Sequence, residues 1–161
     1  MMNKAVFLDR DGVINRERSD YTWLLEDFVM NEGVAETLLE FSRRGYLLIV
    51  VSNQGGIAKG LYAKRDTDYL HLHLQRMLAN KGVELTGIYY CPHHPSVTAC
   101  LCRKPGSLML EKAIARFCID PALSYFIGDA QRDMEAGQKA GLQTILHPAD
   151  APLTRLLPLV K

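Results

Sequence analysis

Two aspartates, Asp9 and Asp11, stand two positions apart directly after the apolar segment KAVFL at residues 4–8. Like charges at this spacing repel, and each raises the pKa of the other unless a positive charge compensates them. Carboxylates are ligands that Mg²⁺ prefers, and Mg²⁺ often bridges to a substrate phosphate. The pair therefore indicates a magnesium site, although a D-x-D sequence on its own is more typical of a turn or a cap.

Polar groups also follow three further apolar segments. They are Ser52 and Asn53 after residues 46–51, Arg103 and Lys104 after residues 85–91 and a cysteine-rich loop, and Asp129 and Asp133 after residues 123–128. Each set is also ordinary turn chemistry, and Asp133 could simply favour a helix dipole. If the segments are parallel strands, however, all of these groups meet at one edge of a sheet.

Such a cluster suits the transfer of a phosphoryl group. Asp9 can attack phosphorus to give an aspartyl-phosphate, and Asp11 can protonate the leaving oxygen and later activate water. Ser52 and Lys104 can bind the phosphate oxygens. Mg²⁺ held by Asp9 and Asp129 would offset the repulsion between the acids and an anionic substrate.

The elements that must position these residues alternate along the chain. Hydrophobic periodicity and glycine stops predict strands at residues 4–8, 46–53, 85–91, 123–129 and 142–147 and helices at 33–45, 64–82, 107–118 and 131–141. Alternation implies right-handed crossovers, and therefore an α/β fold with a mostly parallel sheet and helices on both faces. The proline-containing tail, residues 148–161, is expected to pack loosely or to form a short helix.

The composition is that of an ordinary globular domain. The 161 residues, 48% hydrophobic and 23% charged, are expected to form one domain spanning residues 1–161. Nineteen basic and 18 acidic residues leave a net charge of +1, which argues against a nucleic-acid or membrane-surface role. No apolar run approaches a membrane span and no signal peptide is recognisable, so we expect a cytoplasmic protein, and a monomer.

A cysteine-rich loop at residues 91–102 has the composition of a metal site. The sequence C-x-H followed by C-x-C supplies Cys91, His93, Cys100 and Cys102, a closed tetrahedral set for structural Zn²⁺. His94 is an alternative to His93, and free cysteines are the alternative to a metal. Elsewhere, Cys118 is expected in the core, and His71 and His73, both on the predicted helix 64–82, are expected at the surface.

Four segments together resemble the motifs of the haloacid dehalogenase-like (HAD) phosphohydrolases. They are FLDRDGVIN, VVSNQGGIAKG, CRKP and IGDAQRDMEAGQKAG, and the likeness extends over about residues 4–147. It implies a Rossmann-like three-layer sandwich with five or six strands. Residues 12–32 and 54–102 leave no room for the cap domain that many members insert, so loops must provide specificity.

DRDGVIN followed by SNQ is similar to a narrower branch, the D,D-heptose 1,7-bisphosphate phosphatases and histidinol-phosphatase domains. By that resemblance Asp9 is the nucleophile and Asp11 the general acid and base. Ser52 and Lys104 bind the phosphoryl group, and Mg²⁺ is held by Asp9, Asp129 and the Asp11 backbone carbonyl. The branch also carries a Cys-x-His…Cys-x-Cys zinc loop, which favours His93 over His94. The positions implied for substrate binding are Asn53, Gln54 and Arg103, with Asp20 and Tyr21 as further candidates.

The chain departs from the branch at two places. Ala130 stands where many relatives have a lysine after the fourth-motif aspartate, and Arg132 is the nearest candidate for a replacement. The segment between Asn15 and Tyr21 is one residue longer than usual, which weakens the transfer of roles to Asp20 and Tyr21.

The predicted function is a Mg²⁺-dependent phosphatase that hydrolyses a sugar phosphate monoester, by resemblance a D-glycero-D-manno-heptose 1,7-bisphosphate 7-phosphatase. Cations for a second phosphate are available at Arg16, Arg18, Lys59 and Arg103. Histidinol phosphate is the alternative substrate, since Glu17 or Asp20 could meet its amine. A phospho-acceptor signalling domain and a zinc-ribbon binding module are alternatives of a different class.

Overall fold

A computed structural model describes residues 1–161 and contains a five-stranded sheet in which every neighbouring pair is parallel. The strands are β1 (Lys4–Leu8), β2 (Tyr46–Asn53), β3 (Gly87–Cys91), β4 (Tyr125–Gly128) and β5 (Gln143–Leu146), in the order β3-β2-β1-β4-β5. The predicted α/β class with a parallel sheet is therefore confirmed.

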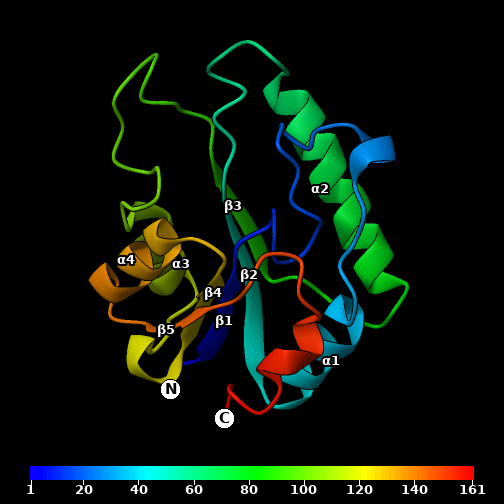
Figure 1. The fold of residues 1–161 in the computed structure, drawn as a ribbon. Helices are drawn as coiled ribbons and strands as arrows, with labels where there is room; N and C mark the ends of the chain where they lie inside the picture. Colours follow the sequence, from blue (N-terminus) through cyan, green and yellow to red (C-terminus); the bar gives the residue numbers. More distant parts are fainter.

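Helices cover both faces of the sheet (Figure 1). Helices α1 (Val34–Arg43) and α2 (Lys64–Ala79) lie on one face, and α3 (Leu108–Arg116) and α4 (Gln131–Lys139) lie on the other. Alternate residues of β1 enter the two cores: Val6 and Leu8 face the α1–α2 side, and Ala5 and Phe7 face the α3–α4 side. This is the three-layer arrangement that a central strand buried on both faces produces.

Short 3₁₀ helices complete the chain: η1 (Leu25–Asp27), η2 (Pro121–Leu123) and η3 (Leu153–Leu156). The tail does form a short helix, η3, but it does not pack loosely. Leu153, Leu156 and Val160 are buried in the α1–α2 core. Their apolar side chains therefore fix the tail despite its three prolines.

Two expectations about single residues are wrong. Cys118 is exposed and has a positive φ of 49°, because α3 ends at Arg116 and the apolar stripe does not continue to residue 118. His71 is only 5% exposed, because α2 turns it inward on the same face as Thr67, Leu74 and Leu78.

The carboxyl ends of the strands form one edge of the sheet, at the top of Figure 1. The strand order reverses between β1 and β4, and such a switch point is where open α/β sheets bind ligands. The connection after β1, residues 9–33, contains only η1, and the connection after β2 is residues 54–63, so neither is an inserted domain. None of the helices has both the length and the apolar character that a membrane span requires.

Candidate functional site

Three carboxylates meet at the switch point. Asp9 follows β1, Asp129 follows β4 and Asp133 lies in the first turn of α4, and one oxygen from each lies within 4.8 Å of the others. The Lys104 ammonium enters the same cluster, with Nζ 2.9 Å from Asp9 Oδ1 and 2.7 Å from Asp133 Oδ1. Asp9, Lys104 and Asp133 are all buried. The structure thus brings together residues from three of the four motifs.

Two glycines allow the acids to come this close. A Cβ on Gly12 would lie 2.0 Å from Asp129 Oδ2, and Gly12 has a φ of +85°, which L side chains rarely adopt. A Cβ on Gly128 would lie 2.3 Å from the Asp133 Cβ. The glycines of DG and IGD are therefore required by the packing of the carboxylates themselves.

The cluster holds more negative than positive charge. Burial raises the pKa of Asp9 to about 7, with Lys104 opposing and Asp133 adding to the shift. Burial and the Asp133 charge also raise the pKa of Asp129. One ammonium among three carboxylates, two of them buried, leaves room for further positive charge, and an all-oxygen donor set fits Mg²⁺.

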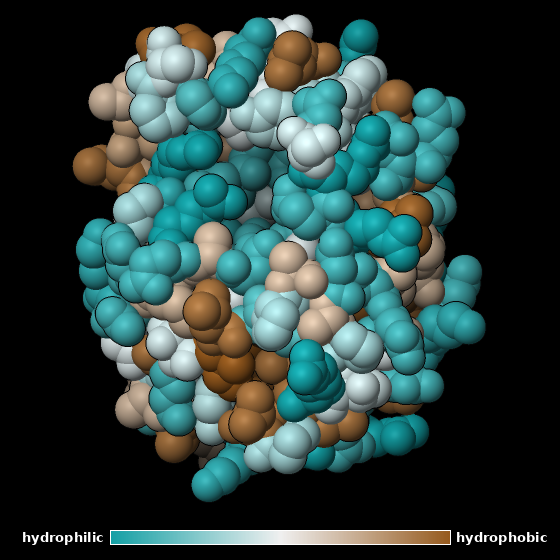
Figure 2. All heavy atoms as spheres, viewed as in Figure 1, coloured by the Kyte–Doolittle hydropathy of each residue, from teal (hydrophilic) through white to brown (hydrophobic).

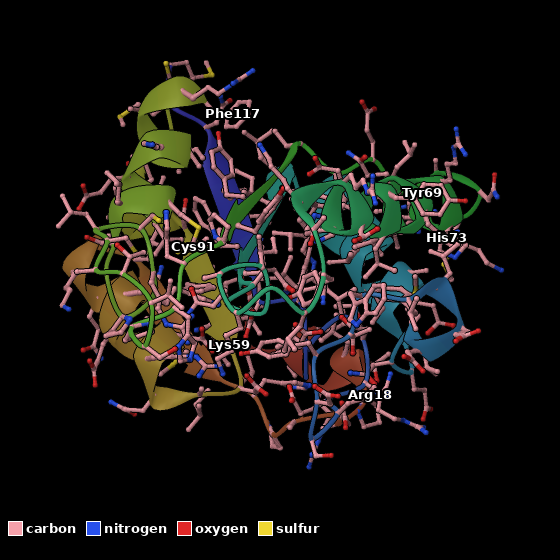
Figure 3. All side chains as sticks on the ribbon, turned by 90° about the horizontal axis from the view of Figure 1, so that it is seen from above. Arg18, Lys59, Tyr69, His73, Cys91 and Phe117 are labelled. Atoms are coloured by element: carbon pink, nitrogen blue, oxygen red, sulfur yellow. The ribbon has the colours of Figure 1, made fainter.

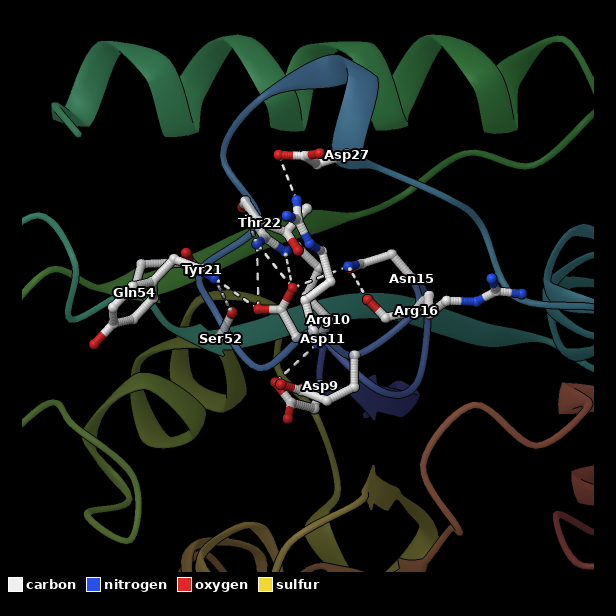
Figure 4. Close-up of polar contacts among 12 residues, drawn as sticks. Asp9, Arg10, Asp11, Asn15, Arg16, Tyr21, Thr22, Asp27, Ser52 and Gln54 are labelled. Carbon is white, nitrogen blue, oxygen red and sulfur yellow. Dashed lines mark hydrogen bonds and ion pairs between the residues drawn. The ribbon is translucent and has the colours of Figure 1, made fainter. Parts of the chain in front are cut away.

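The Asp11 carboxylate has a separate set of partners (Figure 4). Its Oδ1 accepts hydrogen bonds from Arg10 Nη2 at 2.9 Å and Asn15 Nδ2 at 2.9 Å, and its Oδ2 accepts from Gln54 Nε2 at 3.1 Å. Burial acts to raise the pKa of Asp11, but the Arg10 charge and these hydrogen bonds outweigh it and lower the pKa. These hydrogen bonds therefore hold the Asp11 carboxylate in one orientation.

Gln54 connects Asp11 to the predicted phosphate-binding hydroxyl. Its Nε2 donates to Ser52 Oγ at 2.8 Å as well as to Asp11, and its Oε1 accepts from the Tyr62 hydroxyl at 2.7 Å. Gln54 is 1% exposed, so its amide lies below the surface and braces Ser52 and Asp11. The substrate contact predicted for Gln54 stays a prediction.

A polar hollow of about 180 Å³ opens above the strand ends. Hydrophilic side chains surround a recess in the upper part of the face shown in Figure 2. The lining includes four of the residues predicted to bind substrate, together with Arg132: Asp11, Glu17, Asp20, Tyr21, Thr22, Asn53, Gly55, Arg103 and Arg132. Among the other predicted cations, Lys59 Nζ lies 5.4 Å from the centre of the Tyr21 ring, whereas Arg18 is paired with Asp27.

The cysteine-rich loop gathers one nitrogen and three sulfurs. Cys91 Sγ lies 3.6 Å from Cys100 Sγ and 3.1 Å from Cys102 Sγ, and His93 Nδ1 lies 3.4 Å from Cys91 Sγ and 3.2 Å from Cys102 Sγ. This composition fits tetrahedral Zn²⁺. His94 lies outside the cluster, where its Nδ1 accepts from the Ser96 amide at 3.1 Å.

The same loop is bonded to the residues that follow it. The Arg103 amide donates to Cys100 Sγ at 3.4 Å, and Arg103 Nη1 donates to the His93 carbonyl at 3.0 Å. The Asn53 side chain then clamps Lys104, accepting from its amide at 3.0 Å and donating to its carbonyl at 3.1 Å. The cysteine cluster thus contacts Arg103, which directly precedes Lys104 in the chain, and the Lys104 backbone is held by Asn53 at the end of β2.

Reasoning from the sequence missed Arg10, Tyr62 and His71. Arg10 stands between the two acids in the sequence, and its side chain is fully buried, whereas charged side chains usually point to solvent. The available signal for His71 was its spacing of four from Thr67, which places it on the inward face of its helix. Tyr62 carries no sequence signal, since it lies in a loop.

Comparison with known proteins agrees with this site. The model of the HAD-hydrolase-like family matches residues 101–150. A D-glycero-beta-D-manno-heptose-1,7-bisphosphate 7-phosphatase from Photorhabdus laumondii is 42% identical over 87% of this chain and 77% of its own. The corresponding alpha-anomer enzyme from Campylobacter jejuni is 41% identical over 91% of this chain and 83% of its own.

Two solved structures share the fold closely. D,D-heptose 1,7-bisphosphate phosphatase from B. bronchiseptica, complexed with magnesium and phosphate, has a TM-score of 0.86 at 28% identity and covers 97% of this chain and 86% of its own. A HAD-like phosphatase from Mesorhizobium loti has a TM-score of 0.84 at 32% identity and covers 90% of this chain and 72% of its own.

Proposed function

Since this chain belongs to the D-glycero-D-manno-heptose-1,7-bisphosphate 7-phosphatase family of the HAD-like hydrolases, we propose that it removes the 7-phosphate of a manno-heptose 1,7-bisphosphate. The observation that carries the proposal is the buried Asp9, paired with Lys104 and surrounded by Asp129 and Asp133 beneath a polar hollow. That arrangement supplies a nucleophile, a phosphate-binding cation and a cation site at one point.

Binding of the phosphoryl group falls to Ser52 and Lys104. The Lys104 ammonium is already aimed at Asp9, so a phosphate that reaches Asp9 meets it at once. Mg²⁺ held by Asp9, Asp129 and the Asp11 carbonyl would supply the positive charge that the cluster lacks and neutralise the ester dianion.

The reaction proceeds in two displacements. An Asp9 carboxylate oxygen forms a bond to phosphorus while the bond from phosphorus to the C7 oxygen breaks. The protonated form of Asp11, which is the minor form because its neighbours lower its pKa, donates its proton to that oxygen. Water then attacks phosphorus of the aspartyl-phosphate, Asp11 takes the proton back, and inorganic phosphate and the free Asp9 carboxylate are released.

The rest of the substrate occupies the hollow. Arg103 supplies charge for the 1-phosphate, and Asn53, Asp20 and Tyr21 supply polar groups for the sugar hydroxyls. Arg132 lines the same space and can provide the charge absent at Ala130. Histidinol phosphate is the second candidate, because Glu17 and Asp20 both line this hollow and could pair with an amine.

The loop at residues 91–102 is proposed to hold structural Zn²⁺ through Cys91, His93, Cys100 and Cys102. Four protein ligands leave no open position for water, so this ion has no part in hydrolysis. Its contribution is to order a loop with little apolar packing, and thereby to place Arg103 and Lys104. Residues 1–161 then act as a single domain.

A kinetic panel tests the substrate. The alpha and beta anomers of heptose 1,7-bisphosphate and histidinol phosphate are compared by kcat/KM in the presence of Mg²⁺. We expect a heptose bisphosphate to be preferred by at least about 100-fold, because a site built to pair the 1-phosphate rejects a substrate that lacks this second phosphate. A preference for histidinol phosphate would overturn the proposed substrate.

A further inference from the structure

Arg10 is a guanidinium in the interior of the protein, with a fully buried side chain. Arginine stays charged and can only donate, so each buried N–H needs an acceptor. Nη2 donates to Asp11 Oδ1 at 2.9 Å and to the Thr22 carbonyl at 2.7 Å, and Nη1 lies 3.1 Å from His71 Nε2. Three separate parts of the chain therefore hold this side chain in one place.

His71 must be the acceptor in its contact with Arg10. Its burial and the Arg10 charge lower the pKa of His71 to about 3, so the imidazole is neutral. The Nε2 lone pair then accepts from Arg10, and the ring proton is on Nδ1. The ring is also fixed by Tyr90, whose ring packs edge-on with 5.4 Å between centroids and whose hydroxyl donates to Asp68 at 2.6 Å.

Arg10 contacts both oxygens of Asp11 through two nitrogens, with Nη2 2.9 Å from Oδ1 and 3.2 Å from Oδ2 and with Nε 3.3 Å from Oδ1. A guanidinium that holds both oxygens fixes the plane of a carboxylate as well as its position. We propose that His71 is a positioning residue, which sets the orientation of Asp11 through Arg10 and so determines how efficiently the leaving oxygen is protonated. This inference rests on the proposed function, in which Asp11 is the general acid.

A purely structural role for His71 would lead to a different experimental result. If it only satisfied a buried arginine, its loss would lower stability and reduce turnover of every substrate alike. Misplacing a general acid instead penalises poor leaving groups, because a sugar alkoxide needs a proton and a nitrophenolate does not. The ratio of kcat/KM for heptose bisphosphate to that for p-nitrophenyl phosphate therefore separates the two roles.

The experiment compares variants of the full-length protein with Mg²⁺. His71→Phe keeps a flat ring but removes the acceptor, and we expect kcat/KM to fall about 10- to 50-fold for the heptose bisphosphate and less than about 3-fold for the aryl phosphate. His71→Gln keeps an acceptor oxygen and should retain the wild-type ratio within about 3-fold. The matched control is His73→Phe: His73 is on the same helix, packs on Phe28, and lies well apart from Lys59 and Cys91 in Figure 3.

Equal losses on both substrates, or no loss on the heptose bisphosphate, would overturn the positioning role. If His71→Phe does not fold by circular dichroism, Arg10→Lys takes its place, since it keeps the charge and loses the two-pronged contact; the same two outcomes apply. Asp11→Asn is measured in the same panel. If Asp11→Asn lowers kcat/KM equally for both substrates, Asp11 is not the general acid and the proposed mechanism is wrong. If Asp11→Asn lowers kcat/KM selectively for the heptose bisphosphate but the His71 variant does not, only the positioning role of His71 is rejected.

Discussion

The carboxylate cluster and the cysteine loop are both candidate metal sites, yet they are built in opposite ways. Asp9 and Asp129 follow strands and Asp133 lies in the first turn of α4, so the fold itself holds these mostly buried carboxylates close together. The loop at residues 91–102 contains exposed positions, among them Val97 and Leu101, and lacks a core of its own. We infer that the sheet positions the first site, whereas the metal itself must order the second.

The loss of each site should therefore affect the protein in a different way. Damage to the carboxylate cluster should remove catalysis and leave the fold intact. Damage to the cysteine cluster should disorder a segment and reduce catalysis only through Arg103 and Lys104.

The largest effect is expected from Asp9→Asn. An amide cannot serve as the nucleophile, so turnover should fall by at least about 10⁴-fold. Activity is measured by phosphate release and zinc by elemental analysis, and the zinc content should equal that of the wild type. Turnover within a few-fold of wild type would remove Asp9 as the nucleophile.

Gly12→Ala should come next, with activity reduced about 10²- to 10³-fold. The added Cβ would meet Asp129 Oδ2 at 2.0 Å and displace a proposed Mg²⁺ ligand. Magnesium affinity is measured by activity titration. Gly60→Ala is the matched control, because Gly60 also has a positive φ, +74°, but nothing lies within 4 Å of its Cβ position. Equal losses in the two variants would attribute the effect to backbone strain instead.

Cys100→Ser should have a smaller effect on catalysis, about 10- to 100-fold. Loss of the proposed zinc would release the Arg103 amide and loosen Lys104. Elemental analysis should show less than one zinc per chain, and limited proteolysis should cut within residues 91–102. The matched control is Cys118→Ser, which lies outside the cluster and should retain zinc and activity. A zinc-free variant with full activity would reject the link between the loop and Lys104.

The smallest effect concerns pH and magnesium. The pKa of Asp9 is raised from 3.8 to about 7 in the folded protein. Without magnesium, the contribution of Asp9 to stability is therefore fully present below pH 3.8 and is lost as the pH rises to about 7. Magnesium binds the ionised form, and protonation competes with it at pH 5. Saturating Mg²⁺ should therefore raise Tm by about 5–10 °C at pH 8 and by clearly less at pH 5. An equal shift at both pH values, or one preserved in Asp9→Asn, would place the ion elsewhere.

The same contrast explains which parts of the fold and of the site could be predicted from the sequence. Strands and their polar ends are local patterns, so the positions of Asp9, Asp129 and Lys104 could be predicted together with the sheet. The spacing of Cys91, His93, Cys100 and Cys102 is also local, although only the folded loop separates His93 from His94.

Contacts between distant segments could not be predicted in this way. Arg10 and His71 are 61 positions apart, and Gln54 reaches Asp11 across 43. The first pairing depends on how α2 packs on the sheet, and the second on how the segments that follow β1 and β2 meet; no local spacing encodes either. For the same reason the exposure of Cys118 depended on where α3 ends rather than on the apolar stripe before it.

The central claim is that Asp9 meets the phosphoryl group beside a divalent cation bound between Asp9 and Asp129. A crystal structure with Mg²⁺ and beryllium trifluoride tests it most directly, because the fluoride complex bonds to a nucleophilic carboxylate as a phosphoryl group does. The account predicts beryllium on an Asp9 oxygen, Lys104 on a fluoride, and Mg²⁺ bound to Asp9 and Asp129. Beryllium on another residue, or Mg²⁺ away from both carboxylates, would contradict it.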